Sequence, residues 1–377
     1  MYAPHLDDRA RKIDDPVARL RFLRREMQAL QPESGSSARR HLTGRWKGLS
    51  VAGIAVAAIV ATAWPAGVAE TTARERRMAI PTGAAAFEAG QNPVKVWRVE
   101  RSETLETYSN GLRVDLTFVT SNQPRQQYPV FPLNGGTEPV RYQTAPAGIV
   151  YHTTEGQLAD FEESKNGRLK WLGRNLLELA QEERAYHFVI DRFGRVYRVV
   201  EESDIANHAG HSVWADPSGV YVNLNSSFLA VSFEGQTGEP SAVTAAQIQA
   251  ARMLTEMLRS KYSIPAENCV THAQVSVAGA NNQIGAHVDW ASQFPFAAVG
   301  LPDNYAEPLP SMIVFGFEYN SAFVKASGGR WKGLDLAETQ VAQQAASLGM
   351  TVTRYRAILQ HRYSDILGVV TEIEGGG

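Results

Sequence analysis

The sequence predicts a domain of the α/β class, because short apolar strands alternate with amphipathic helices over residues 147–303. The first strand, 148–152, reads GIVYH and ends in a histidine. Two helices have apolar residues at helical spacing, one over 169–184 and one that begins at Thr244 and ends near Tyr262. Further strands are predicted over 186–190, 196–200, 228–234 and 269–271, with a turn at 191–194.

Composition limits the classes of function. The chain has 377 residues, which is more than one average domain needs, so one main domain with extra segments is expected. A formal net charge of -2 argues against nucleic-acid binding, which usually requires a basic surface. The single cysteine, Cys269, excludes an intrachain disulfide and is predicted to be a small buried apolar residue.

The first 92 residues divide into three parts. Residues 1–48 are polar and rich in arginine, residues 49–69 contain no charged side chain, and residues 70–92 read as a linker. An uncharged run of this length is typical of a transmembrane helix, and the basic residues before it predict a cytoplasmic N-terminal segment. A buried core helix is one alternative, and a cleaved signal that ends at 67–69 is another. We expect an uncleaved anchor that places the later residues outside the cytoplasm.

Residues 93–146 contain a predicted β-hairpin segment that leads into the α/β domain. Apolar residues alternate with polar ones at Trp97, Val99, Leu105 and Tyr108, and again at Leu112, Val114, Leu116 and Phe118. Asn110 and Gly111 lie between the two halves, and this dipeptide favours a two-residue turn.

Residues 308–377 are predicted to form a small helical C-terminal region. Amphipathic helices are predicted over 334–347 and 352–366, joined at Gly349. The aromatic-rich stretch 315–323 is expected to pack against them.

Two histidines each follow a short apolar strand, a position that suits a metal site. His152 closes the strand 148–152, and His272 follows the strand 269–271. Catalytic zinc typically takes three protein ligands and leaves a fourth position open for water. An acidic residue close by, Asp289, would complete such a set. Histidines at strand ends are more often structural, so the residues alone leave both roles open.

Six segments, in order, resemble the zinc amidase family that includes bacterial and phage N-acetylmuramoyl-L-alanine amidases and the peptidoglycan recognition proteins. They are IVYHTTEG (149–156), AYHFVIDRFGRVYRVV (185–200), ANHAG (206–210), FLAVSFEG (228–235), VTHAQVS (270–276) and AHVDWASQFPF (286–296). The resemblance implies a central mixed β-sheet flanked by helices, with a zinc ion in a surface groove. It also implies three zinc ligands, which are His152, His272 and Asp289.

The resemblance implies catalytic helpers as well. Tyr186 stands where some members carry a tyrosine that hydrogen-bonds the zinc water or the developing oxyanion. His287 stands where the family usually has a lysine; it is expected to stabilise an oxyanion or protonate the leaving amine, and it rivals Asp289 as a metal ligand. Ser232 occupies the position of a glutamate that is catalytic in many bacterial members. Glu234, on the same strand face, would replace that glutamate after a small register change; otherwise it is a carboxylate with a structural partner.

Other polar residues in the matching segments have two interpretations each. His208, in the motif HAG, is expected to contact substrate. Asn223 is a further candidate for substrate binding, although surface turns use asparagine equally often. His211 is predicted to cap or pack within its loop, and His187 is predicted to be a satisfied core histidine.

The function implied by the resemblance is hydrolysis of the amide bond between the lactyl group of N-acetylmuramic acid and the first L-alanine of the stem peptide. The expected cofactor is Zn²⁺, the expected partner is peptidoglycan, and the expected location is the bacterial cell envelope, with the catalytic domain in the periplasm behind a single-pass anchor. The alternative is a non-catalytic peptidoglycan-binding module of the same fold. The residues at His287 and Ser232, which depart from the family pattern, keep this alternative open.

Overall fold

The computed structural model describes residues 94–237 and 243–375. The predicted N-terminal segment (1–48), transmembrane helix (49–69) and linker (70–92) therefore lie outside the described residues. Within the described ranges, no helix has both the length and the apolar character that are needed to cross a membrane.

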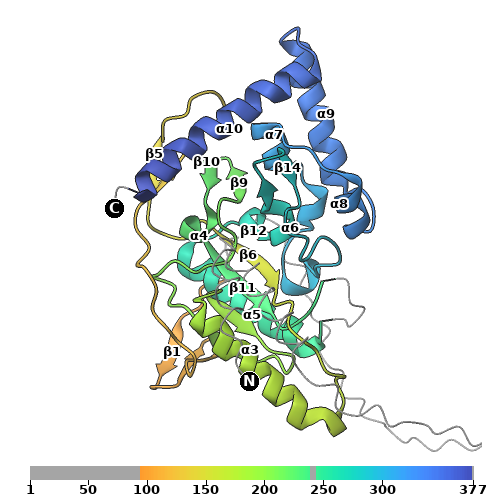
Figure 1. The fold of residues 1–377 in the computed structure, drawn as a ribbon. Coiled ribbons are helices and arrows are strands. Elements are labelled where there is room, and N and C mark those ends of the chain that lie inside the picture. The colour runs from red at the N-terminus through yellow and green to blue at the C-terminus, as the bar shows by residue number, and fades with distance from the viewer. Residues whose placement is uncertain (1–93, 238–242, 376–377) are drawn as a thin grey trace, which may run out of the picture. The chain divides into compact units, whose positions relative to one another are not determined.

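A mixed sheet forms the centre of the fold, as predicted (Figure 1). Among the described residues it has eight strands in the order β1-β2-β3-β8-β7-β11-β6-β12. Their bounds are Arg98–Arg101 (β1), Leu105–Tyr108 (β2), Arg113–Asp115 (β3), Gly148–Thr153 (β6), Phe188–Ile190 (β7), Val196–Arg198 (β8), Phe228–Phe233 (β11) and Cys269–Thr271 (β12). The four strands β7, β11, β6 and β12 are parallel neighbours, whereas β1, β2 and β3 are antiparallel to one another and β7 is antiparallel to β8.

Two long helices cover opposite faces of this sheet. Helix α3 (Asn166–Glu182) packs in one apolar cluster with Ala230 of β11, and α5 (Ala245–Tyr262) packs in another with Val231. Successive strand residues point to opposite faces, so the two helices lie on either side of β11. Thr244 caps α5, and Gln247 completes a capping box with it, which explains why the predicted helix begins there.

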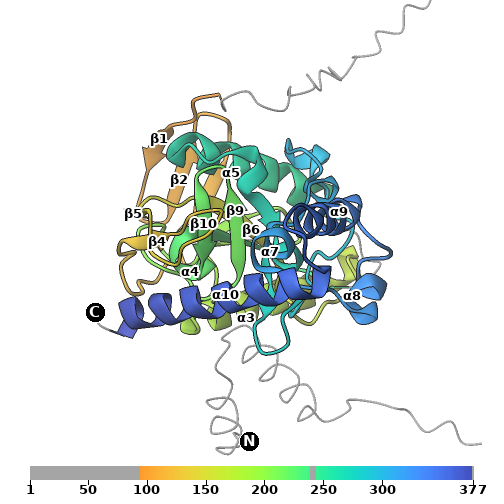
Figure 2. The ribbon, with the colours of Figure 1, turned by 90° about the horizontal axis from the view of Figure 1, so that it is seen from above.

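Smaller elements and the C-terminal helices pack around β6 and β12. The strands are Tyr128–Val130 (β4), Arg141–Gln143 (β5), Val213–Asp216 (β9), Gly219–Val222 (β10), Val277–Ala278 (β13) and Gln283–Ile284 (β14). The helices are Leu224–Ser227 (α4), His272–Val275 (α6), Pro310–Phe315 (α7), Ser321–Ala326 (α8), Lys332–Ser347 (α9) and Val352–Gly375 (α10). Figure 2 shows α10 passing beside α4 and β10. The rings of Phe315 and Phe317 pack on Tyr363 of α10, which confirms the packing expected for the aromatic stretch.

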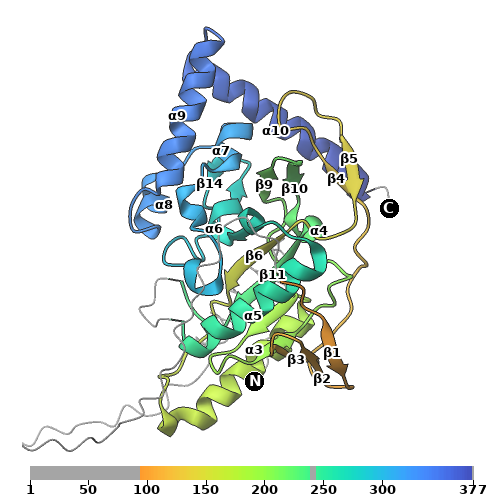
Figure 3. The same cartoon turned by 180° about the vertical axis from the view of Figure 1, so that it is seen from behind.

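The predicted hairpin is present but differs in detail. Its first half is two antiparallel strands, β1 and β2, rather than one. The Tyr108 N–H donates to the carbonyl of Leu112, and Gly111 has a φ of 87°, so the turn between β2 and β3 has three residues, not two. Strand β3 then pairs in parallel with β8, so the hairpin extends the central sheet beside α5 (Figure 3).

A buried network of charges joins this extension to the rest of the fold. Glu106 of β2 is fully buried, and Oε2 of its carboxylate lies 2.8 Å from the Arg198 guanidinium of β8. Arg198 also contacts Glu202 at 2.7 Å, and Glu202 contacts Lys261 of α5 at 2.8 Å. Burial alone would raise the pKa of Glu106, but the hydrogen bonds and charge of Arg198 outweigh burial and lower the pKa to about 2.

We expect Glu106→Gln to lower the free energy of unfolding at pH 7 by roughly 3 kcal/mol. This value is near the low end for breaking a buried ion pair, because Glu202 still pairs with Arg198 in the variant. The pKa of Glu106 is depressed in the folded state, so its stabilisation is present above the ordinary pKa of about 4.5 and is lost as the pH falls toward 2. Urea unfolding followed by circular dichroism should show the two proteins converging below pH 4.5. The exposed Glu103→Gln is the matched control, and a difference below about 0.5 kcal/mol for Glu106→Gln at pH 7 would contradict the prediction.

Candidate metal centre

Parallel pairing of β6 with β12 brings two histidines to the same end of the sheet. The register places Tyr151 opposite Thr271, so the next residues, His152 and His272, emerge side by side. Strand β12 ends there, because His272 is the first residue of α6. The Thr271 side chain and Gln274 form a capping box at the start of α6, which holds the His272 backbone at the strand end.

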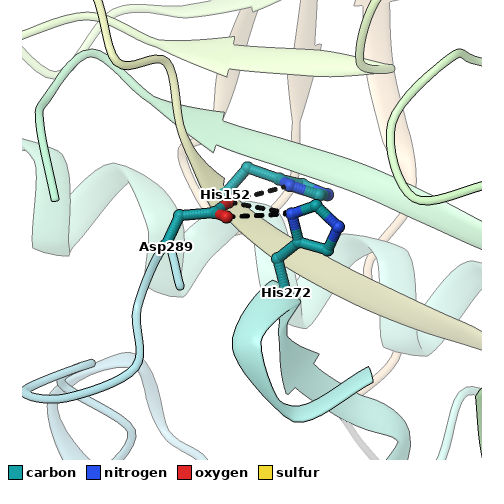
Figure 4. A group of neighbouring side chains, drawn as sticks. All are labelled: His152, His272 and Asp289. Atoms are coloured by element: carbon teal, nitrogen blue, oxygen red, sulfur yellow. Dashed lines mark hydrogen bonds and ion pairs between the residues drawn. The ribbon is translucent and has the colours of Figure 1, made fainter. Parts of the chain in front are cut away.

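Asp289 reaches the two histidines from a loop that follows the β13–β14 hairpin. The Ala273 N–H of α6 donates to the Asp289 carbonyl at 3.2 Å, which ties this loop to the helix. Oδ1 of Asp289 lies 2.9 Å from Nδ1 of His272, and Oδ2 lies 3.2 Å from Nδ1 of His152 (Figure 4). One ligand atom from each of the three residues lies within 4.8 Å of the others, and none of the three is more than 1% exposed.

The protonation states of these residues suit a cation. Burial lowers the pKa of His272 to about 3, so its imidazole is neutral near pH 7. Burial alone would raise the pKa of Asp289, but its contacts with His272 and His152 outweigh burial and hold the pKa well below the usual range. His272 and Asp289 therefore present a neutral nitrogen and an ionised carboxylate, and imidazole and carboxylate are donors that zinc accepts.

The distances between the donors also fit zinc. Tetrahedral bonds of about 2.0–2.1 Å place neighbouring ligand atoms about 3.3 Å apart, close to the 3.2 Å that separates Oδ2 of Asp289 from Nδ1 of each histidine. The third member of this group is Asp289 and not His287. Its ring stacks on His272 with centroids 4.6 Å apart and an angle of 14°, which suits a helper beside the cluster better than a rival ligand.

Tyr186 lies against the cluster, as expected for a helper. Its side chain is fully buried, and its ring centroid is 5.2 Å from that of His152. Strand β7 begins only at Phe188, so Tyr186 lies in the irregular segment before it, with a φ of 63°. A bulky residue rarely adopts this left-handed conformation, and strain of this kind persists only where the surrounding structure imposes it.

The catalytic role expected of Glu234 is not supported. Strand β11 keeps a regular register with β6, and Ser232 pairs with His152, so no register change carries Glu234 toward the cluster. Oε2 of Glu234 accepts the Arg192 N–H at 3.1 Å instead. Burial raises the pKa of this carboxyl, which acts as a strand-end group with a structural partner. Ser232 is fully buried, and its hydroxyl has no hydrogen-bond partner among the described residues.

A pocket of about 570 Å³ is lined by residues that neighbour His152 and Asp289 in sequence, but not by the three clustered residues themselves. Thr153, which follows His152, lines it, and so do Val288 and Trp290 on either side of Asp289. Glu234 is also among the residues that line this pocket.

His208 is placed differently from the expectation. Its ring is 2% exposed, so it offers almost no surface to a substrate. Nδ1 of His208 lies 3.2 Å from Nε2 of His152, a contact that joins residues 56 positions apart and that no sequence motif indicates. Burial and the neighbouring histidines lower its pKa well below the usual range, and the ring is neutral.

The remaining polar residues have structural contacts. Asn223 caps α4: its side chain accepts the Asn225 N–H, and its amide donates to Glu374 of α10. His211 also contacts Glu374, at 3.3 Å. His187 is fully buried, and its Nδ1 accepts the Ala230 N–H at 2.9 Å, which confirms the prediction of a satisfied core histidine. Cys269 is likewise buried, as predicted.

Several solved structures resemble parts of the chain. An N-acetylmuramoyl-L-alanine amidase LysC from Clostridium intestinale URNW shares 23% identity over 41% of this chain and 83% of its own, with a TM-score of 0.25. AmpDh3 from Pseudomonas aeruginosa, in complex with anhydromuramic pentapeptide, shares 19% sequence identity over 44% of this chain and 63% of its own, with a TM-score of 0.32. AmiD from E. coli, in complex with a substrate, shares 21% sequence identity over 46% of this chain and 58% of its own, with a TM-score of 0.27. Identities and scores this low support no conclusion by themselves.

The model of one protein family matches part of this sequence. No curated protein matches the chain, but residues 142–289 match the family described as N-acetylmuramoyl-L-alanine amidase. The matched range includes His152 and His272 and ends at Asp289, so it contains the whole cluster. The segment that carries the cluster is therefore similar to the N-acetylmuramoyl-L-alanine amidase family.

Proposed function

We propose that this protein is a zinc-dependent peptidoglycan amidase that cleaves the bond between the lactyl group of N-acetylmuramic acid and the first L-alanine of the stem peptide. The observation that carries the proposal is the buried group of His152, His272 and Asp289, whose ligand atoms lie within 4.8 Å of one another in the segment that matches the family. These residues would hold Zn²⁺ and leave a fourth coordination position open.

The chain's own side chains supply the rest of the chemistry. A bound zinc ion would polarise the amide carbonyl and lower the pKa of a water molecule. Tyr186, beside the His152 ring, would donate its phenol O–H to the carbonyl oxygen on which negative charge develops. His287, stacked on His272, would give a proton to the departing amine nitrogen of L-alanine. The pocket lined by Thr153 and Trp290 provides room for the stem peptide beside the scissile bond.

We also propose that the protein works in the bacterial cell envelope, anchored by the uncharged run 49–69. Peptidoglycan lies outside the cytoplasm, so an anchor of this orientation would deliver the amidase domain to its substrate. The basic residues before the run support this orientation.

The purified full-length chain should contain close to one zinc ion per molecule by elemental analysis. His152→Ala should lose that zinc, because two ligands rarely retain a structural or catalytic zinc ion. His361→Ala, which changes an exposed histidine on α10, is the matched control and should retain it. A wild-type protein without bound zinc, even after dialysis against the metal, would overturn the assignment of the site.

Digestion of isolated peptidoglycan separates an amidase from a binding module. Wild-type protein should release free stem peptides, detected by mass spectrometry. Asp289→Ala should reduce that release by more than the roughly 10–100-fold that follows loss of an outer-shell partner. Asp365→Ala on α10 should behave as wild type. Peptidoglycan binding without released peptides, in a wild-type protein that holds zinc, would instead support the non-catalytic alternative.

The pH dependence tests the role of His287. A group that donates a proton to the leaving amine must be protonated, so kcat/KM should fall as the pH rises through the pKa of that group. Lysine ordinarily stays protonated to a much higher pH than histidine, so His287→Lys should shift the alkaline limb of the profile upward. His287→Ala should lower kcat by about 10²–10⁴-fold. An unchanged alkaline limb in His287→Lys would exclude His287 as the acid.

A further inference from the structure

His208 makes a buried contact with one member of the metal-binding group. Its Nδ1 lies 3.2 Å from Nε2 of His152, and the two rings meet edge to face at 82°. His152 is 0% exposed and His208 is 2% exposed, so water does not compete for this contact. His272 differs: its Nε2 has no hydrogen-bond partner among the described residues.

The chain holds His208 in place through one asparagine. Oδ1 of Asn225 accepts three consecutive backbone N–H groups, those of His208 at 3.0 Å, Ala209 at 2.8 Å and Gly210 at 2.9 Å. The carbonyl of Gly210 accepts the Leu224 N–H at 2.8 Å and closes the loop on α4. Three donors that converge on one oxygen define the backbone conformation, and with it the direction of the His208 side chain.

The positions of the protons follow from the chemistry of imidazole. A neutral imidazole has one N–H and one nitrogen with a free lone pair. Nδ1 of His152 faces Asp289 at 3.2 Å, so Nδ1 is the nitrogen that would bind zinc, and the proton of His152 must then be on Nε2. Nε2–H can only donate, and Nδ1 of His208 lies where the acceptor must be.

We propose that His208 is a positioning residue that accepts the Nε2–H of His152, and thereby fixes the tautomer and ring orientation of this ligand. The inference rests on the proposed zinc site, and it replaces the substrate contact expected of His208. Outer-shell partners of metal-bound histidines typically change metal affinity by about 10–100-fold. Asn225 acts one step further out, because it holds the loop that carries His208.

Two variants of nearly equal size test the acceptor directly. In His208→Asn, the side-chain oxygen can occupy the position of Nδ1 and accept the hydrogen bond, whereas His208→Leu has a similar shape and no acceptor. Zinc dissociation constants of the full-length chain, measured by competition with a chromophoric chelator, should rise about 10–100-fold in His208→Leu and by less than about 3-fold in His208→Asn. His211→Ala, at an exposed histidine of the same loop, should leave zinc affinity unchanged.

A second pair keeps the test decisive if His208→Leu does not fold. Asn225→Ala removes the acceptor of the three N–H groups and leaves His208 in the chain, whereas Asn225→Asp keeps an acceptor. Asn225→Ala should bind zinc more weakly than Asn225→Asp. Circular dichroism and Tm identify folded variants.

The outcomes separate this inference from the proposed function. A wild-type chain that binds no zinc would overturn the proposed metal site itself. A wild-type chain that binds zinc and releases stem peptides, with folded His208→Leu and His208→Asn equal in zinc affinity, would overturn only the role of His208. If His208→Leu is unfolded, equal zinc affinities of Asn225→Ala and Asn225→Asp would overturn the role of His208 instead.

Discussion

The parallel register of β11, β6 and β12 is the constraint on which the candidate centre depends. It pairs Ser232 with His152 and Tyr151 with Thr271, so His272 follows at the same level of the sheet. A slip of one residue in β6 would turn His152 to the opposite face, where Tyr151 now packs in the cluster that contains α5. Regular pairing of three neighbouring strands is therefore what brings residues distant in sequence into one candidate metal-binding cluster.

Burial of the cluster then determines its chemistry. A neutral imidazole and an ionised carboxylate coexist there because burial lowers the pKa of His272 to about 3, while contacts with both histidines keep the pKa of Asp289 low. A group with this composition and these short distances is best satisfied by a cation. Around it, Tyr186, His287 and His208 each approach from a different segment of the chain. The three clustered residues are therefore surrounded by a second set of side chains that contact their rings.

Residues outside the matched segment complete the core around the site. Val150 and Val270, each two residues before a histidine of the cluster, share an apolar cluster with Phe315 and Leu334 of the C-terminal helices. At the opposite edge, Glu106 and Arg198 connect the β1–β3 extension to the sheet through buried charges. The family match covers 142–289, but the core that supports it draws on residues from both sides.

The sequence by itself determined the α/β class, the strands at 148–152 and 269–271 and the helix from Thr244, because hydrophobic period and helix caps are local signals. The three residues of the cluster were implied by the resemblance of six ordered segments to a known family, and the structure brings the three together. It did not determine the three-residue turn at Gly111 or the partner of Glu234, which depend on hydrogen bonds to other segments. Only the tertiary structure placed His208 behind His152, His287 on His272, and Ser232 beside His152. The physical reason is that such contacts arise from strand register and loop closure, which bring together residues that carry no common pattern along the chain.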